Sequence, residues 1–249
     1  MTNLNNKVAL VTGSARGIGK AIAERYGSLG ASVVVNYVAS ERPAQETVAA
    51  IKRLGGTATA IQADVSKVAD IDRLFEKTIE QYGRLDIVVA NAGLELIGKL
   101  MTDVTEAEFD RLFDVNTKGA YFTLARAGKH IADHGRIIFV GSSSTGFPMP
   151  GYSLYSGSKV APRFFVEVLA KELGSRGVTV NSILPTVTEG AGLSADGARP
   201  RALEFIQGFN PMQRAGTLGD VADAAEYLAG DLSAFVSGQH LLLSGGGPA

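Results

Sequence analysis

The chain has 249 residues, and 24 Lys and Arg balance 25 Asp and Glu for a formal net charge of -1, so no basic excess points to a nucleic-acid partner. Cys is absent, which excludes disulfides, thiolate metal sites and cysteine nucleophiles. No apolar run approaches the roughly 18–20 residues that cross a bilayer, and residues 1–7 lack the apolar core of a signal peptide. We therefore expect a cytoplasmic protein with no membrane partner.

Short apolar runs recur along the whole chain. They cover residues 8–11, 33–35, 57–61, 85–89, 137–140, 178–183 and 241–243. Most are apolar throughout rather than alternating, which is typical of strands covered on both faces. Each run therefore predicts one strand of a buried parallel sheet.

Helix-period segments lie between these runs. We expect helices over about 17–29, 41–54, 114–132 and 152–173. Ser66 is expected to cap a further helix that ends before Gly83, and Asp220 is expected to begin a last helix that ends near residue 229. Thr105 and Glu108 fit a capping box, and Pro162 predicts a kink or local break. The alternation predicts an α/β fold: one doubly wound parallel sheet of about seven strands with helices on both faces. We expect a single domain over 1–249, in which the patternless segment 186–218 forms a substrate loop.

Three glycines follow the first predicted strand and open the first predicted helix. Gly13 suits a tight turn, Gly17 lets main-chain N–H groups approach a pyrophosphate, and Gly19 permits close packing of the helix. The amino end of that helix then favours phosphate charge. This placement predicts a Rossmann-like dinucleotide site.

Further motifs follow in a fixed order: Thr12-Gly-x-x-x-Gly-x-Gly19, Asn91-Ala-Gly93, Asn116 and Tyr155-x-x-x-Lys159. In this order they resemble the short-chain dehydrogenase/reductase family, and the resemblance extends from Lys7 to Gly246. Among its members the chain is similar to ketone and 3-oxoacyl reductases of about 250 residues. The chain departs from the family at Thr186, which stands where Gly usually follows Pro185, and at Ser244, which replaces an Asp.

The end of the second strand meets the adenosine ribose in this fold, and an NAD-preferring site places a carboxylate there. Residues 35–40 contain no acid. Asn36, Tyr37 and Ser40 lie at this position, where amide, hydroxyl and main-chain groups can hydrogen-bond a 2′-phosphate, and Arg16 of the glycine loop can add a charged donor. We therefore expect NADP, with NAD as the alternative.

The resemblance also implies a set of cofactor contacts. In chain order these are Gly13, Ser14, Arg16, Gly17, Ile18, Gly19, Asn36, Tyr37, Ser40, Asp64, Val65, Asn91, Ala92, Gly93, Tyr155, Lys159, Pro185 and Thr188. Asp64 and Val65 match the family's adenine-contacting pair, and Pro185 to Thr188 match the segment beside the nicotinamide carboxamide. For Asp64 a purely structural role in its turn stays open.

Four residues match the family's catalytic group. Tyr155 and Lys159 are four apart on a predicted helix and so share one face. There an ammonium, together with the positive oxidised nicotinamide, lowers the pKa of a phenol so that it can exchange a proton with the substrate oxygen. Ser142 is the expected donor to the substrate carbonyl, and Ser143 is its rival. Asn116 is implied to hold a water that links Lys159 to solvent.

These observations predict an NADP-dependent oxidoreductase that reversibly reduces a ketone or aldehyde to an alcohol. The alternative is a non-catalytic nicotinamide sensor on the same fold. His130 and His134 are four apart, but no third ligand accompanies them, so we expect no metal site. The expected partner is a small carbonyl or alcohol substrate, and the resemblance implies a homotetramer or homodimer.

Overall fold

A seven-stranded parallel sheet forms the centre of the computed structural model, which describes residues 2–192 and 210–247. The strand order is β3-β2-β1-β4-β5-β6-β7. The strands are β1 Val8–Val11, β2 Ser32–Tyr37, β3 Thr57–Gln62, β4 Ile87–Ala90, β5 Arg136–Val140, β6 Thr179–Pro185 and β7 His240–Leu243. All seven expected strands are present, so the predicted doubly wound parallel sheet is confirmed.

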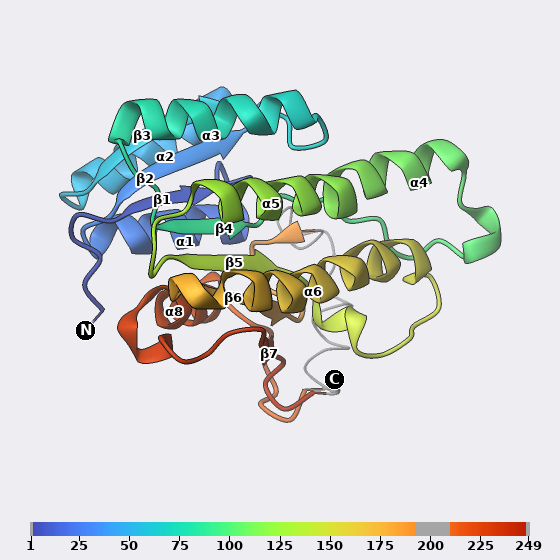
Figure 1. Cartoon of the computed structure of the whole chain (residues 1–249). Helices are drawn as coiled ribbons and strands as arrows, with labels where there is room; N and C mark the ends of the chain where they lie inside the picture. Colours follow the sequence, from blue (N-terminus) through green and yellow to red (C-terminus); the bar gives the residue numbers. More distant parts are fainter. Residues whose placement is uncertain (1, 193–209, 248–249) are drawn as a thin grey trace.

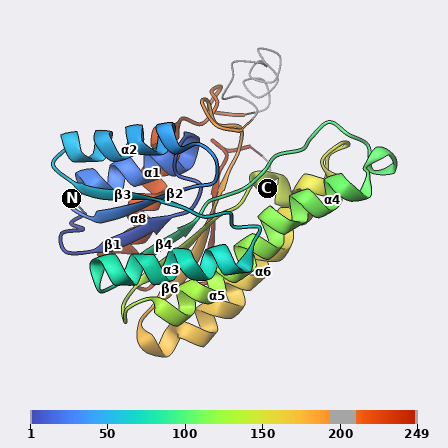
Figure 2. The ribbon, with the colours of Figure 1, turned by 90° about the horizontal axis from the view of Figure 1, so that it is seen from above.

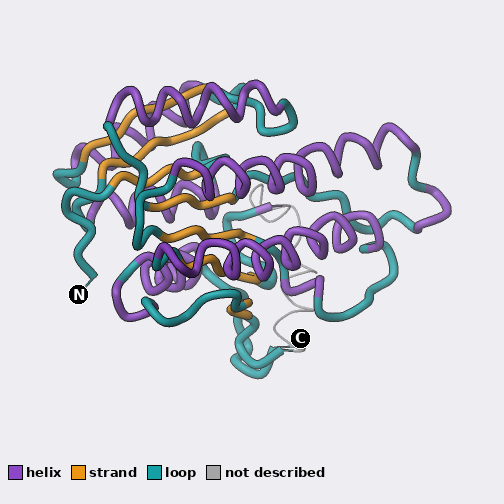
Figure 3. The backbone as a smooth tube through the Cα atoms, viewed as in Figure 1, coloured by secondary structure: helices purple, strands orange, loops and turns teal. Residues whose placement is uncertain are grey.

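Helices cover both faces of this sheet (Figures 1 and 3). They are α1 Gly17–Ser28, α2 Glu41–Arg53, α3 Val68–Tyr82, α4 Glu106–Phe113, α5 Ala120–His130, α6 Ser153–Leu173 and α8 Leu218–Ala229. Seen from above, α1 and α2 lie on one face with α8, and α3, α5 and α6 lie on the other (Figure 2). None of the described helices is long and apolar enough to cross a membrane.

Alternate residues of the strands pack into two separate cores. In β1, Ala9 and Val11 belong to the core under α1, α2 and α8, while Val8 and Leu10 belong to the core under α3, α5 and α6. Both sets are buried. A strand buried on both faces needs apolar side chains at every position, which is why these segments read as continuous apolar runs.

Three helix boundaries differ from the expectations. Helix α3 begins at Val68 after Lys67, and the Ser66 hydroxyl donates to Asp64 Oδ1 at 2.7 Å instead of capping the helix. Helix α8 begins two residues before Asp220, because Thr217 and Asp220 form a capping box. The expected break at Pro162 does not occur, since α6 runs continuously from Ser153 to Leu173.

A π-helical segment, Asp114–Gly119, joins α4 to α5 where the sequence predicted one regular helix. Such widened turns are rare and concentrate at functional sites. Asn116 lies in this segment and is fully buried. The departure from regular helix therefore coincides with a residue of the expected catalytic group.

The parallel register brings the carboxyl ends of the central strands to one edge of the sheet. The strand order reverses between β1 and β4, which are hydrogen-bonded neighbours. Ligands of open α/β sheets bind in the crevice at such a switch point. The glycine loop follows β1, the Asn91–Gly93 turn follows β4, and the serines at 142–144 follow β5, so all three meet at this edge.

Candidate active site

The glycine loop after β1 has the geometry that its sequence predicts. Gly13 and Gly17 have φ values of +61° and +55°, a region that favours glycine. A Cβ on Gly13 would lie 2.9 Å from Cα of Ala92, and a Cβ on Gly19 would lie 2.6 Å from the Gly13 carbonyl oxygen. A side chain on Gly13 or Gly19 would therefore collide with the neighbouring main chain, so glycine at these two positions lets the loop and the start of α1 pack closely.

Asn36 fixes this loop from the end of β2. Its Oδ1 accepts from the Gly13 N–H at 3.0 Å, and its Nδ2 donates to the carbonyls of Ile61 and Ala63 at 3.3 and 3.0 Å. The side chain is buried. The expectation that the Asn36 amide binds a 2′-phosphate is thus corrected: its hydrogen-bonding groups are committed to the main chain of the glycine loop and β3.

Two more polar side chains hold the same loop. Asn91 Nδ2 donates to the Thr12 carbonyl at 2.8 Å, and the Ser14 hydroxyl donates to the Val11 carbonyl at 2.7 Å. The Thr12 hydroxyl accepts from the main-chain N–H of Ala92 at 3.0 Å. The side chains of Asn91 and Ser14 therefore shape the site, and contact with a cofactor falls to main-chain atoms here.

The amino end of α1 is the open part of the loop. No side chain caps it, and the N–H groups of its first turn, including Gly17, Ile18 and Gly19, have no intrahelical partner. Such an end attracts anionic groups. Arg16 precedes the helix, is exposed and has no ion-pair partner within the described residues. These residues fit the pyrophosphate and the 2′-phosphate of a dinucleotide.

The other expected cofactor residues differ in their exposure and in their hydrogen bonds. Tyr37 is partly buried at the end of β2, and the exposed Ser40 precedes α2 without a capping hydrogen bond. Asp64 accepts from the N–H and the hydroxyl of Ser66, at 3.0 and 2.7 Å, so its carboxylate organises its own turn. Val65 follows it and is buried.

Pro185 is the last residue of β6, which pairs with β7. At position 186, where the family usually has Gly, the Thr186 N–H donates to the Leu243 carbonyl at 3.1 Å. The main chain therefore stays hydrogen-bonded to β7 one residue beyond β6. Thr188 is buried and its hydroxyl donates to the Thr186 carbonyl at 2.9 Å. Part of the expected substrate loop, residues 193–209, lies outside the described residues.

Lys159 is buried under the Asn91–Gly93 turn. Its Nζ donates to the Val140 carbonyl at 3.2 Å and lies 5.3 Å from the Phe139 ring centroid. Burial lowers the pKa of Lys159 to about 8, and the nearby Glu95 opposes that shift. A Cβ on Gly93 would lie 2.9 Å from this Nζ, so glycine at position 93 leaves the ammonium its place.

Tyr155 lies on the same helix, and Ser142 is near enough to its hydroxyl to influence its pKa. Burial raises the pKa of Tyr155 well above its ordinary value, Glu95 raises it further, and Ser142 acts in the opposite direction. In the protein alone desolvation prevails, and the lowered pKa of Tyr155 stays a prediction for the state with oxidised nicotinamide beside the phenol. The serine that acts on Tyr155 is Ser142, as expected, and no such effect is found for Ser143.

Asn116 connects the π-helical segment to the turn after β4. Its Oδ1 accepts from the Leu94 N–H at 2.8 Å, and its Nδ2 donates to the Leu94 carbonyl at 2.9 Å and to the Ser158 hydroxyl at 3.0 Å. Ser158 precedes Lys159 on α6. Asn116 thus joins the loop and the helix that carry the expected catalytic group.

Several further residues around Tyr155 carry no recognisable sequence signal. Glu95 follows the Asn91–Gly93 turn and acts electrostatically on both Tyr155 and Lys159. Ser144 and Ser156 continue the hydrogen bonding of Ser142, at 2.9 and 3.0 Å. Single Ser and Glu residues in loops are too common for sequence patterns to distinguish them, and only their positions in space connect them to Tyr155.

A second constellation with catalytic residue types lies elsewhere. His240 Nδ1 is 2.6 Å from the Ser182 hydroxyl, and His240 Nε2 is 2.9 Å from Glu167 Oε1. Ser182 is fully buried in β6, so a substrate has no access to its hydroxyl. This triad ties β7 to β6 and α6 and has a structural role.

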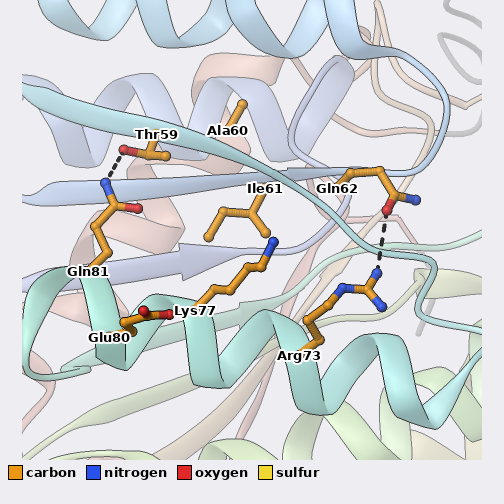
Figure 4. A pocket seen from close by; sticks show the side chains of 8 residues that line it. All are labelled: Thr59, Ala60, Ile61, Gln62, Arg73, Lys77, Glu80 and Gln81. Atoms are coloured by element: carbon orange, nitrogen blue, oxygen red, sulfur yellow. Dashed lines mark hydrogen bonds between the residues drawn. The ribbon is translucent and has the colours of Figure 1, made fainter.

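A pocket on the outer strand β3 contains none of the expected site residues. Side chains of β3 and α3 line it, among them Gln62, Arg73, Lys77 and Glu80 (Figure 4). Arg73 is already paired with Asp70 Oδ1 at 2.8 Å. Within 2–192 and 210–247, no cluster of three metal-ligating side chains is found either.

Known proteins are similar to this chain over nearly its whole length. The family model described as enoyl-(acyl carrier protein) reductase matches residues 13–247. A short-chain dehydrogenase/reductase of Pestalotiopsis microspora is 43% identical over 258 aligned positions, which cover 98% of this chain and 96% of the relative.

Solved structures of reductases are also similar to this chain. The promiscuous reductase LugOII, which catalyses keto-reduction at C1 during lugdunomycin biosynthesis, is 38% identical with a TM-score of 0.91, over 98% of this chain and 99% of its own. The landomycin C-6 ketoreductase LanV, solved with NADP and rabelomycin, is 34% identical with a TM-score of 0.89. The match covers 98% of this chain and 97% of LanV. This chain belongs to the short-chain dehydrogenase/reductase family and is an NAD(P)-dependent oxidoreductase.

Proposed function

We propose that this protein reduces a ketone to a secondary alcohol with NADPH, in a reversible reaction in which Tyr155 transfers the proton. The observation that carries the proposal is that Ser142 after β5 and the buried Lys159, whose Nζ donates to the Val140 carbonyl at 3.2 Å, meet at the edge of the sheet where the glycine loop opens, with Tyr155 on the helix of Lys159. The two residues are one turn apart on that helix. Keto-reduction by the similar LugOII and LanV supports a ketone rather than an aldehyde.

The chain's own residues account for cofactor binding. The open first turn of α1 holds the pyrophosphate, and Arg16 holds the 2′-phosphate. Lys159 holds the ribose hydroxyls of the nicotinamide half. The chemistry that a bound NADPH would supply is a hydride for the carbonyl carbon.

The proton steps follow from the state of Tyr155. Because burial raises its pKa, Tyr155 carries its proton at neutral pH, which is the state that reduction requires. Ser142 donates a hydrogen bond to the substrate oxygen, and Tyr155 donates its proton to the same oxygen as negative charge develops there. Asn116 acts by position, through the turn at Leu94 and through Ser158.

The test is NADPH oxidation over a panel of ketones, with NADH in parallel. We expect the Tyr155→Phe variant to lose more than about 100-fold of kcat, because general acid catalysis contributes roughly 10²–10⁴-fold, while NADPH binding is kept. Ser142→Ala should lose about 10²-fold, and Ser143→Ala should stay close to wild type. A wild-type protein that binds NADPH but reduces no ketone would favour the sensor alternative.

We also propose that subunits pair through exposed apolar side chains. Val160, Phe164 and Val168 lie four apart along α6, and Leu232 and Phe235 are exposed after α8. Exposed apolar side chains grouped along one face are typical of interfaces. The family resemblance favours a homotetramer, with a homodimer as the alternative, and light scattering after gel filtration distinguishes these from a monomer.

A further inference from the structure

Three serine hydroxyls form a connected chain that ends at Tyr155. Ser156 Oγ donates to Ser144 Oγ at 3.0 Å, Ser144 Oγ is 2.9 Å from Ser142 Oγ, and Ser142 lies near enough to Tyr155 to lower its pKa. Ser142 and Ser144 are buried, and Ser156 is partly buried on α6. Neither Ser144 nor Ser156 belongs to the catalytic group implied by the family motifs.

The direction of the chain follows from counting protons. A serine hydroxyl has one proton to donate and two lone pairs that accept. The Ser144 proton finds only the oxygens of Ser156 and Ser142 among its hydrogen-bond partners in the described residues, and Ser156 is itself the donor. Ser144 therefore donates to Ser142.

Ser142 is then fully occupied as an acceptor. It receives the Ser144 hydroxyl at 2.9 Å and also the Ser144 main-chain N–H, at 3.2 Å. With both lone pairs engaged, its only remaining function is to donate its proton, and Tyr155 is the partner on that side. Hydrogen bonds in such a chain polarise one another and strengthen the final donor.

We propose that Ser144, supported by Ser156, is a positioning residue that makes Ser142 an obligate hydrogen-bond donor, toward Tyr155 in the protein alone and toward the substrate oxygen when a substrate is bound. The proposal rests on the proposed function of Ser142 and Tyr155. A serine free to rotate spends part of its time accepting a hydrogen bond, which gives no help to a developing alkoxide or phenolate. The chain removes that alternative, and Ser142 favours the phenolate form of Tyr155.

The test compares Ser144→Ala, Ser156→Ala and the double variant with wild type. Ser144→Ala should lower kcat about 5- to 10-fold with little change in KM or NADPH affinity. In alcohol oxidation, its pH–rate profile should move to higher pH, because Tyr155 loses a donor that stabilises the phenolate. Ser156→Ala should have a smaller effect in the same direction.

The double variant separates a chain from two independent structural roles. If Ser156 acts through Ser144, the double variant is no slower than Ser144→Ala. Ser153→Ala is the matched control, since Ser153 is exposed one turn before Ser156. The thermal midpoint and NADPH affinity of each variant establish that it is folded.

The outcomes distinguish this proposal from the proposed function. A Ser144→Ala variant with wild-type kcat and pH profile, beside an inactive Tyr155→Phe variant, overturns the role of Ser144 and leaves the reaction intact. If the losses of kcat in Ser144→Ala and Ser156→Ala multiply in the double variant, Ser156 does not act through Ser144, and the proposed chain is overturned. Full activity of Tyr155→Phe overturns the proposed function itself.

Discussion

The hydroxyl of Thr117 donates a hydrogen bond, at 2.9 Å, to the main-chain carbonyl of Ser158. Pro162 lies four residues after Ser158 in α6 and has no N–H, so this carbonyl lacks its helical partner. Thr117 supplies the missing donor from the π-helical segment that carries Asn116. This hydrogen bond explains how α6 continues through a proline, and it attaches the helix of Tyr155 and Lys159 to Asn116.

The pair can be tested by a double-mutant cycle. We expect Thr117→Val to lower the free energy of unfolding by about 1–3 kcal/mol, because it leaves a carbonyl without a donor. In a Pro162→Ala background the same change should cost less than about 0.5 kcal/mol, since the new N–H restores the helical hydrogen bond. Urea unfolding of the four proteins gives the coupling, and equal costs in both backgrounds would contradict it.

Asn36 makes the glycine loop sensitive to a buried charge. Asn36→Asp should lower the free energy of unfolding by about 3 kcal/mol at pH 7, because it places a carboxylate against the carbonyls of Ile61 and Ala63. These oxygens raise the pKa of the new carboxyl above its unfolded value of about 4.

The folded N36D variant therefore binds a proton more tightly than the unfolded chain does. Its deficit relative to wild type is complete above the folded pKa and shrinks as the pH falls toward about 4. Urea unfolding at several pH values measures this. Asn6→Asp, at an exposed position, is the control, and a deficit independent of pH would show that the carboxyl is not desolvated.

Glu95 sets the charge around the catalytic pair. It raises the pKa of Tyr155 and that of Lys159, so Glu95→Gln should lower both. For ketone reduction, which needs protonated Tyr155, the decline of kcat at high pH should begin about 0.5–1 unit lower. Glu172→Gln changes the same charge at an exposed position on α6 and should leave the profile in place. A shift to higher pH would contradict the assignment.

Arg16 should decide between the two nicotinamide cofactors. With the Asn36 side chain committed to the main chain, Arg16 is the charged donor before the open end of α1. Arg16→Ala should weaken NADPH binding about 10- to 100-fold, the cost of a charge-assisted hydrogen bond at roughly 1.5–3 kcal/mol. NADH binding should change little. Fluorescence titration with each cofactor gives both affinities, and an equal loss for the two would assign Arg16 to the shared pyrophosphate.

The sequence by itself determined the strands and most of the helices of this protein and predicted its main site residues. Strands buried on both faces are apolar at every position, and the glycines of the loop follow a fixed spacing. Both patterns can therefore be recognised in the sequence alone. Tyr155 and Lys159 share one helix, and a single helical turn relates them. Local rules were enough for each of these features.

Only the tertiary structure decided what the polar groups do. The position of Asn36 in the sequence predicts a phosphate ligand. In the folded chain, however, its side-chain amide is hydrogen-bonded to the main chain of Gly13 and Ala63. The hydrogen bond of Ser144 to Ser142, and the partner that Thr117 gives to Ser158, depend on which atoms the folded chain brings together. A hydrogen bond requires two groups within about 3 Å, and the chain brings such groups together only when the sheet and its helices are assembled.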